Sequence, residues 1–578
     1  MVSALLIKPR NLGFDRRQVE VNFEPLGLMY LSAFVKKYSD HRVHVVDAQA
    51  ESSRIEELPD GRFRRGMADE QIGELVRRLE PAVVGISCLF EWLAEDAVRI
   101  ARIVRRDAPA AIVVVGGMDA SVRYDEYLSS EDIDLVVVGS GEEVFLEILA
   151  TVDRGEEPTG IPGTCERIGA RRHEDHHQAV GVIAGCGTCA ESTTGGRAVV
   201  EKDERVRVNP RAKPLVPFDE YPFPDRDCLP RRLYDDHRNQ AISYPFARDY
   251  PAILIQSSRG CALRCAFCEI ISVFDVWQAH GAEYVVAEIE ECVRKYGARE
   301  FIFLDDNFML RTKRVEEICR LIVQRGLKVS LDVLPGISVW TLSERLIDLM
   351  VEAGLYRVCL PIESGNPKTL AFIRKPVDLD RTKHMIEYCN RKGLLTHGNL
   401  IIGFPYETEE DIHRTVEWGK QSGLDAINYF VAQPVKGARM YPIYEENKWF
   451  EHHESALHAD HSWRAHESWR TAHFTSGELG RMASEASSAY LIHRFCSYLI
   501  PTNAARYVWP KINSMRKARY VARVATYVLL RGRKVSSNQR LFTPLALLRG
   551  LFTGARAFAI RQKSRERQVT KSLRDNSS

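Results

Sequence analysis

Three cysteines lie close together in the stretch SSRGCALRCAFCEI, residues 257–270: Cys261, Cys265 and Cys268. Closely spaced thiolates are soft ligands that suit an iron–sulfur cluster. A four-iron cluster held by three cysteines keeps one iron open for a ligand that is not protein. The alternatives are buried free thiols or a zinc site, for which the following stretch offers only His280 as a fourth ligand. The spacing favours the cluster.

The elements that position these thiols alternate between strand and helix over residues 251–435. Apolar runs such as AILIQSS, EFIFLDD and YRVCLPIES are separated by helical stretches such as EYVVAEIEECVRKYG. Six such units predict all or part of a parallel (β/α) barrel, in which function lies at the carboxyl ends of the strands. The cysteines directly follow the first of these strands.

With Phe267 just before the last cysteine, the motif resembles that of the radical S-adenosylmethionine (SAM) superfamily. FLDDNF, CLPIESG, GNLIIGFPYET and FVAQPVKGARMY follow in the order that this family has. The resemblance implies that the open iron binds the amino and carboxylate groups of SAM, and that one-electron reduction yields a 5′-deoxyadenosyl radical. It also implies SAM contacts at Phe267, Asp306, Glu363, Ser364, Gly365 and Asn399.

Residues 1–150 predict a second α/β unit, a doubly wound, Rossmann-like domain. Short β-branched runs end in Gly, Asp or Ser and alternate with helical stretches, and ligands of such folds bind at those strand ends. The ordered strings EPLGLMYLSAFV, VVDA, VVGISC, VVVGGMDAS and VVVGSGEE resemble the cobalamin-binding module of cobalamin-dependent (class B) radical SAM enzymes. The resemblance implies cobalamin contacts at Gly27, Asp47, Ser87, Gly116, Gly117, Gly139, Gly141 and Glu142. A degenerate domain that binds nothing is the alternative.

The cobalt is expected to lack a protein histidine. The Asp-x-His-x-x-Gly motif of histidine-ligated cobalamin proteins is absent, and the nearest string, with Asp175 and His177, has Val where Gly belongs. That string lies in residues 151–245, which we interpret as a connector with a small hairpin. The connector also holds Cys186 and Cys189, a loop pair for which a metal or redox role is the less favoured interpretation.

We place the barrel domain at residues 246–440 and a mainly helical, basic region at residues 441–578. Between His452 and His473, six histidines suggest either a solvated helical segment or a zinc site. From Arg506 onward, the sequence has eighteen Lys or Arg residues and two acidic residues. This composition favours a helical cap with a solvated face or peripheral contact with an anionic membrane. No nucleic-acid recognition motif accompanies these charges.

Composition sets limits on the whole chain of 578 residues. A formal net charge of +2 favours no particular partner, and we find no apolar run long enough to span a membrane. The thirteen cysteines, several in apolar segments, suit a reducing compartment, so we expect a cytoplasmic enzyme.

The resemblance implies a methyltransferase acting on an unactivated carbon. One SAM would remake methylcobalamin, and a second would give the radical that takes hydrogen from the substrate. We expect a small precursor of a secondary metabolite such as an antibiotic, a sugar or a lipid, either free or carrier- or lipid-linked, with a flavodoxin- or ferredoxin-type electron donor. Cyclisation, ring contraction or oxidation without methyl transfer is the alternative, and a binding protein that has lost catalysis is a third. The sequence assigns no catalytic side chain beyond the cofactor contacts.

Overall fold

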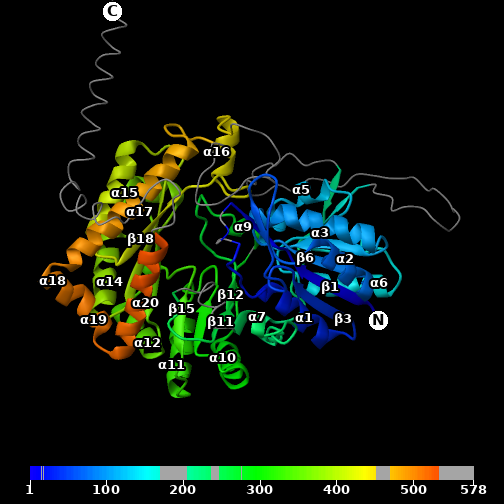
Figure 1. Cartoon of the computed structure of the whole chain (residues 1–578), viewed down its shortest axis with the longest axis horizontal. Coiled ribbons are helices and arrows are strands. Elements are labelled where there is room, and N and C mark those ends of the chain that lie inside the picture. Colours follow the sequence, from blue (N-terminus) through cyan, green and yellow to red (C-terminus); the bar gives the residue numbers. More distant parts are fainter. Residues whose placement is uncertain are drawn as a thin grey trace, which may run out of the picture.

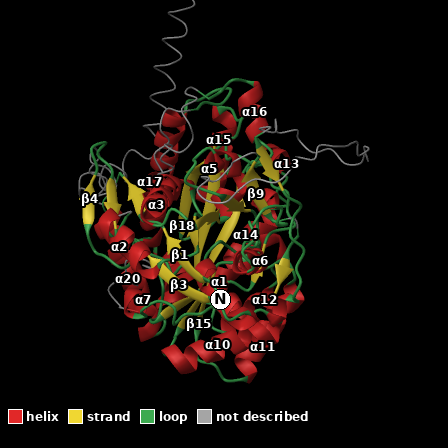
Figure 2. Ribbon diagram, turned by 90° about the vertical axis from the view of Figure 1, so that its right-hand side faces the viewer, coloured by secondary structure: helices red, strands yellow, loops and turns green. Residues whose placement is uncertain are grey.

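The computed structural model places two α/β units side by side, with a helical region beyond the second (Figure 1). It describes residues 1–14, 16, 19–168, 205–235, 246–274, 276–450 and 469–532. Asp175, His177, Cys186, Cys189 and all but the last of the six clustered histidines lie outside these residues. Seen from the side, strands form the interior of the molecule and helices surround them (Figure 2).

The N-terminal unit is built on a seven-stranded sheet in the order β10-β9-β8-β7-β6-β1-β3. Its parallel strands are β1 (Ser3–Lys8), β3 (Arg42–Asp47), β6 (Val83–Ser87), β7 (Ile112–Gly116) and β8 (Leu135–Val137). In chain order this is the arrangement 2-1-3-4-5 of doubly wound folds, with the reversal between β1 and β6. The predicted doubly wound domain is therefore confirmed.

Two short strands from the predicted connector extend this sheet. β9 (Thr164–Arg167) pairs antiparallel with β8, and β10 (Val206–Val208) pairs antiparallel with β9. The expected hairpin is thus part of the N-terminal sheet rather than a separate feature. A small antiparallel sheet of β2 (Asn11–Gly13), β5 (Phe63–Arg65) and β4 (Ile55–Glu57) lies beside it.

Amphipathic helices cover both faces of the N-terminal sheet. They include α1 (Leu26–Tyr38), α2 (Asp69–Leu79), α3 (Ala94–Asp107), the short α4 (Met118–Val122) and α5 (Tyr124–Leu128), and α6 (Glu142–Asp153). On α3, Ala97, Ile100, Ala101 and Val104 recur at helical spacing and are fully buried against the sheet. The strands, apolar on both faces, are accordingly covered on both sides.

The second unit contains the six predicted parallel strands as two groups of three. β11 (Ala252–Ile255), β14 (Glu300–Phe303) and β15 (Ser330–Val333) form one group. β16 (Arg357–Glu363), β17 (Leu395–Ile402) and β18 (Ala426–Val431) form the other. A parallel bridge between Leu331 and Leu355 links the two groups. The predicted partial (β/α)6 barrel is confirmed.

Helices cover the outside of this partial barrel. They are α10 (Ala282–Tyr296), α11 (Thr312–Gln324), α12 (Glu344–Glu352), α13 (Pro367–Ile373), α14 (Leu379–Arg391) and α15 (Glu409–Gln421). Caps fix where several begin: Ser343, Asn366, Asp378 and Thr408 each accept a backbone N–H of the first turn.

The described residues of the C-terminal region, 441–450 and 469–532, are mainly helical, as predicted. It comprises α16 (Tyr441–Glu446), α17 (Ser476–Tyr498), α18 (Pro501–Asn503), the π-helical turn Ala504–Val508, α19 (Trp509–Ile512) and α20 (Met515–Gly532). The Tyr490 hydroxyl donates to the Leu424 carbonyl at 2.6 Å and ties α17 to the barrel. Among the described helices, none is long and apolar enough to cross a membrane.

Candidate cofactor site

The cysteine loop is anchored at the carboxyl end of β11. After β11 the chain forms β12 (Ser258–Arg259), which pairs antiparallel with β13 (Gln278–Ala279), and the three cysteines lie between them. The Asp305 carboxylate accepts the Ser257 N–H at 2.7 Å, and the Asp306 carboxylate accepts the Gly260 N–H at 2.8 Å. Gly260 has a φ of 76°, which suits glycine and turns the chain toward Cys261.

The three thiols fit a multi-iron cluster better than a zinc ion. Cys265 is buried, whereas Cys261 and Cys268 are partly exposed, so the group has an accessible side. A structural zinc ion would need a fourth ligand beside these three thiols, whereas a four-iron cluster can keep one iron open. Burial raises the pKa of the Cys268 thiol to about 12, so binding a metal must displace its proton.

His280, the candidate fourth zinc ligand, is occupied elsewhere. Its buried ring is stacked between Phe218, with centroids 3.9 Å apart, and Tyr284, with centroids 3.8 Å apart. Burial, with two nearby Arg residues, lowers its pKa to about 2, so the ring is neutral. It packs between the connector and α10, and the zinc alternative loses its fourth ligand.

Glu363 lies at the end of β16 and is buried with a φ of 68°. Its carboxylate accepts a hydrogen bond from the Lys375 ammonium at 2.8 Å, and both side chains are less than a tenth exposed. Burial disfavours the Lys375 ammonium, but Glu363 outweighs this and the pKa of Lys375 is raised. Lys375 also lies 5.9 Å from the Phe267 ring centroid and 5.3 Å from that of Trp340. It is the functional candidate that sequence reasoning missed.

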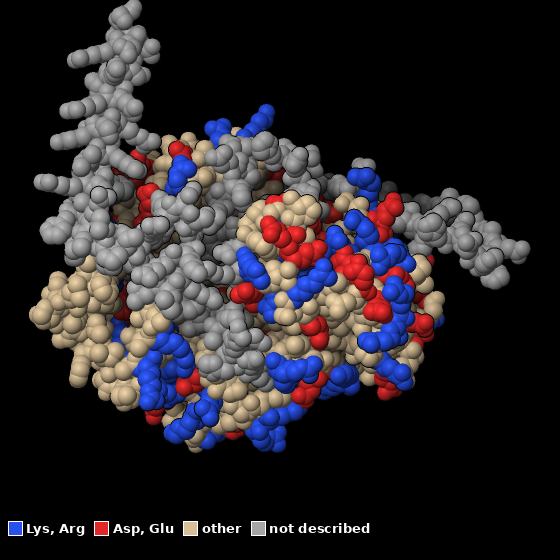
Figure 3. Space-filling view, in the orientation of Figure 1, with Lys and Arg blue, Asp and Glu red and all other residues tan. Residues whose placement is uncertain are grey.

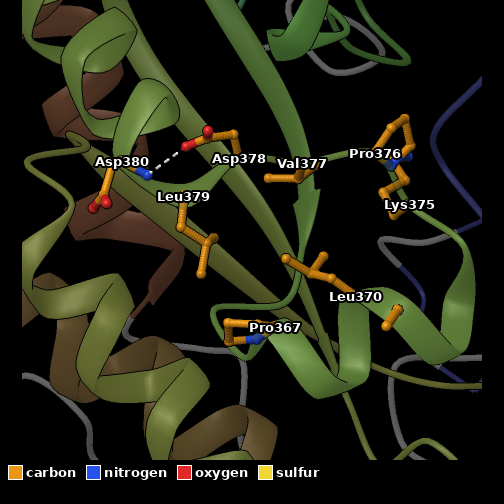
Figure 4. Close-up of a pocket in the computed structure, with 9 residues that line it drawn as sticks. Pro367, Leu370, Lys375, Pro376, Val377, Asp378, Leu379 and Asp380 are labelled. Atoms are coloured by element: carbon orange, nitrogen blue, oxygen red, sulfur yellow. Dashed lines mark hydrogen bonds between the residues drawn. The ribbon is translucent and has the colours of Figure 1, made fainter.

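A hollow of about 610 Å³ lies between α13 and the start of α14, with Lys375 on its wall (Figure 4). Leu370, Val377 and Leu379 form apolar parts of that wall, and Asp378 accepts the Asp380 N–H at 3.0 Å to begin α14. Because Lys375 also contacts Glu363, this hollow adjoins the group of residues expected to contact SAM.

The other predicted SAM residues fall into two groups. Ser364 is fully buried and its hydroxyl lies 2.8 Å from that of Thr415, while a Cβ on Gly365 would lie 2.5 Å from the Trp418 Cβ. These two residues pack β16 against α15. Asn399, on β17, differs, because its buried amide oxygen has no hydrogen-bond partner among the described residues, while its nitrogen donates to Cys359 at 3.4 Å. An orphaned acceptor of this kind fits a ligand that brings a donor.

The glycines predicted to contact cobalamin also differ from one another. Among the described residues, no atom lies within 4 Å of where a Cβ on Gly27 would be, so its backbone is open to a large ligand. A Cβ on Gly116 or Gly141 would be in ordinary van der Waals contact, with nearest atoms at 3.6 Å. Gly117 instead packs against its own domain, since a Cβ there would lie 2.3 Å from the Cys88 carbonyl oxygen. A Cβ on Gly139 would lie 3.2 Å from the Val273 carbonyl oxygen, across the seam with the barrel.

Of the polar cobalamin candidates, Ser87 ends β6 beside the strand-order reversal and is partly exposed. Asp47 is fully buried on the edge strand β3. One of its oxygens accepts from Lys8 and from the Tyr234 hydroxyl at 2.7 Å, and the other accepts two backbone N–H groups. Both oxygens of Asp47 are thus engaged within the protein, and its side chain braces the turn after β3.

Glu142, at the start of α6, joins the two candidate sites. Its carboxylate lies 2.6 Å from the Arg259 guanidinium, and both side chains are less than a tenth exposed. Arg259 stands two residues before Cys261 and also lies over the rings of Tyr30 and Phe218. The cluster loop is therefore fixed to the loop after β8, and the two predicted cofactor regions meet at this seam.

Comparison with known protein families decides the assignment. The family model described as Radical SAM superfamily matches residues 255–419, and that described as B12 binding domain matches residues 15–149. The chain belongs to the B12-binding radical SAM enzymes. Its cofactors are a [4Fe–4S] cluster, SAM and cobalamin. The predicted family and cofactors are confirmed.

Individual relatives of this B12-binding radical SAM enzyme align over much of its length. It is 26% identical to the uncharacterized methyltransferase PH0819 of Pyrococcus horikoshii, covering 85% of this chain and 93% of that one. It is also 26% identical to the cytidylyl-2-hydroxyethylphosphonate methyltransferase of Streptomyces wedmorensis, over 72% and 77% of the two chains. The anaerobic magnesium-protoporphyrin IX monomethyl ester cyclase of Rubrivivax gelatinosus is 23% identical, over 72% and 65%.

Among solved structures, the radical SAM methyltransferase TsrM of Kitasatospora setae superposes with a TM-score of 0.62. The sequences are 16% identical, and the match covers 92% of this chain and 99% of TsrM. This likeness concerns the fold, which both chains share from the N-terminal sheet to the C-terminal helices.

Proposed function

We propose that the protein is a cobalamin-dependent radical SAM methyltransferase that methylates an unactivated carbon of a small molecule. The observation that carries this proposal is the buried Arg259–Glu142 pair, which holds the cysteine loop against the carboxyl edge of the N-terminal sheet. Two methyltransferase relatives at 26% identity support the reaction class. When bound, the cofactors supply a 5′-deoxyadenosyl radical that takes hydrogen and a methyl group that replaces it.

The chain's own residues have defined parts in this proposal. Cys261, Cys265 and Cys268 hold the cluster, and the Asp305 and Asp306 carboxylates fix their loop. Glu363 and Asn399 offer acceptors to SAM, and Lys375 holds Glu363 in place. Gly27, Gly116 and Gly141, with Ser87, form the surface that cobalamin approaches. Substrate would then lie between the two units, shielded from water by the seam.

We further propose a precursor of a secondary metabolite, sugar or lipid as substrate, with electrons from a flavodoxin- or ferredoxin-type donor. All described cysteines are free thiols, which supports a reducing, cytoplasmic setting. The anaerobic cyclase relative favours a second candidate, a cyclisation that uses the same cofactors without methyl transfer.

The products of SAM distinguish the two candidates. Anaerobically reconstituted protein would be incubated with cobalamin, SAM and a strong reductant, and the products followed by mass spectrometry. A methyltransferase forms both S-adenosylhomocysteine and 5′-deoxyadenosine, and a Cys268→Ala control loses the deoxyadenosine. Deoxyadenosine without S-adenosylhomocysteine would favour the cyclase, and neither product from cluster-loaded protein would contradict both.

A further inference from the structure

A second pocket lies at the opposite end of the barrel from the cysteine loop. It has a volume of about 170 Å³ and is bounded by residues just before β16 and β17 and by α19 and α20. Leu355, Leu394 and Val521 give it an apolar floor. The cysteines follow the carboxyl end of a parallel strand, whereas this pocket lies at the amino ends, so it is separate from the cofactor site.

The charged residues that line this pocket are all cations: Arg248, Lys392, Lys511 and Lys517. Two of them have carboxylate partners outside the lining. The Lys511 ammonium lies 2.6 Å from Asp425, and the Lys392 ammonium lies 2.6 Å from Asp348. The remaining cations, Arg248 and Lys517, therefore decide the charge of the pocket.

Arg248 and Lys517 are poorly compensated. The Arg248 guanidinium donates to the Ser330 hydroxyl at 2.8 Å and lies 3.4 Å from Asp249, a carboxylate that it shares with Arg516 at 2.5 Å. The buried Glu300 attracts Arg248 as well but makes no ion pair with its guanidinium. The Lys517 ammonium donates to the Pro510 carbonyl at 3.1 Å, and no ion pair of Lys517 occurs among the described residues. Arg248 and Arg516 thus share one carboxylate, and Lys517 has no carboxylate partner among the described residues.

Burial, together with a neighbouring cation, disfavours the charged form of each of these two residues. The pKa of Lys517 is lowered, first by burial and then by Arg248. The pKa of Arg248 is lowered, first by burial and then by Arg516. Like charges in a partly enclosed space attract an anion that neutralises them. Lys and Arg side chains also gather on the surface near α12 (Figure 3).

We propose that this pocket binds a small phosphate-bearing ligand, with the Lys517 ammonium and the Arg248 guanidinium as its donors. Both groups form charge-assisted hydrogen bonds to phosphate oxygens. The volume of 170 Å³ equals that of about five or six water molecules, at about 30 Å³ each, which leaves room for one or two phosphate groups. The apolar floor accommodates a short carbon chain. Ligand bound here would join α20 to the amino ends of β16 and β17.

Titration of the full-length, cluster-loaded protein with pyrophosphate tests this proposal. We expect saturable binding by calorimetry, and at least tenfold weaker binding by Lys517→Met, which removes the charge but keeps the aliphatic chain. Arg519→Met is the matched control, because Arg519 is exposed on the same helix and does not line the pocket. It should bind pyrophosphate as the wild type does.

Three outcomes would overturn the proposal: no pyrophosphate binding, equal weakening in both variants, or no weakening in Lys517→Met. Melting curves of both variants without ligand check that each is folded, and pyrophosphate should raise the melting temperature of the wild type and Arg519→Met only. Sedimentation with phosphatidylglycerol vesicles tests the other source of phosphate. If both variants still bind vesicles and the protein does not bind pyrophosphate, the basic surface binds lipid and the proposed pocket site is wrong.

Discussion

At the scale of single residues, the pair of Lys375 and Glu363 offers the sharpest test of the candidate SAM site. Both side chains are buried and joined at 2.8 Å. Removing one partner of a buried pair leaves an uncompensated charge, which costs about 3–5 kcal/mol. We therefore predict that Lys375→Met lowers SAM cleavage at least tenfold and raises the KM for SAM, measured as 5′-deoxyadenosine formed under reducing conditions.

Lys368→Met is the control for this prediction, because Lys368 lies on α13 with a side chain 70% exposed and its ammonium lies 3.2 Å from Asp411 rather than beside Glu363. It should leave SAM cleavage nearly unchanged. The double variant Lys375→Met with Glu363→Gln should recover melting temperature but not SAM affinity. If the double variant recovers both melting temperature and SAM affinity, Lys375 serves packing alone. The same conclusion follows if Lys375→Met and Lys368→Met change SAM cleavage equally.

The residues that could be predicted from sequence are those whose spacing is local. Cys261, Cys265 and Cys268 stand within one loop, so their chemistry is visible in the chain itself. Lys375 is twelve positions after Glu363 and meets it only because α13 turns the chain back. A single Lys before Pro376 belongs to no local sequence pattern, so its contact with Glu363 could not be predicted. Ser364 and Gly365 match a motif, yet their contacts show that a motif residue can serve packing.

At the scale of elements, the Arg259–Glu142 pair joins β12 to the start of α6. We predict that Glu142→Gln lowers the melting temperature and exposes the loop between β12 and β13 to protease, because the Arg259 guanidinium would lose its buried counter-ion. Cobalamin should still bind, as followed by absorbance of the corrin. SAM cleavage should fall, because the cysteine loop would no longer be held against the N-terminal sheet.

Glu147→Gln is the matched control on the same helix, since Glu147 is 54% exposed and faces Arg154 at the surface. Exposed pairs contribute about 0–1 kcal/mol, so this variant should melt and resist protease as the wild type does. If Glu142→Gln behaves in the same way as the control, the pair does not hold the seam.

The helices and strands were largely predictable, because the periodicity and the length of an apolar pattern are local properties of the sequence. The strands of both parallel sheets coincide with β-branched apolar runs, and alternating helices imply parallel order. The pairing of β9 and β10 with the N-terminal sheet was not predictable in this way. These strands have three or four residues, and β10 lies beyond a long segment from β9, so their partner is set by tertiary packing.

At the scale of the whole molecule, Arg226 lies where three parts of the chain meet. It comes from the segment between the two α/β units and is buried together with both of its carboxylate partners. Its guanidinium lies 3.2 Å from Glu24, before α1, and 2.8 Å from Glu288, on α10. It also donates to the Leu254 carbonyl of β11 at 2.7 Å. One side chain thus links the N-terminal unit, the connecting segment and the barrel.

We predict that Arg226→Met separates the unfolding of the two units. The buried Glu288 would lose its cation, at a cost of about 3–5 kcal/mol, while Glu24 would keep its pair with Arg231. That cost falls on the contact between the units, which one apolar cluster also spans, and the remaining core of each unit stays intact. Calorimetry should therefore change from one main transition to two, and small-angle scattering should show a more extended molecule. Arg320→Met, which removes a surface pair within α11, should change neither measurement.

Adding Glu24→Gln and Glu288→Gln to Arg226→Met tests the cause. If unpaired charge separates the units, the triple variant should regain part of the lost melting temperature, because neutral amides cost less to bury than carboxylates. SAM cleavage should fall in Arg226→Met as in Glu142→Gln, because separated units no longer hold the cysteine loop through the Arg259–Glu142 pair. Formation of S-adenosylhomocysteine should fall, because it needs both units together. A single transition at unchanged temperature would instead mean that the apolar seam, rather than Arg226, holds the two units.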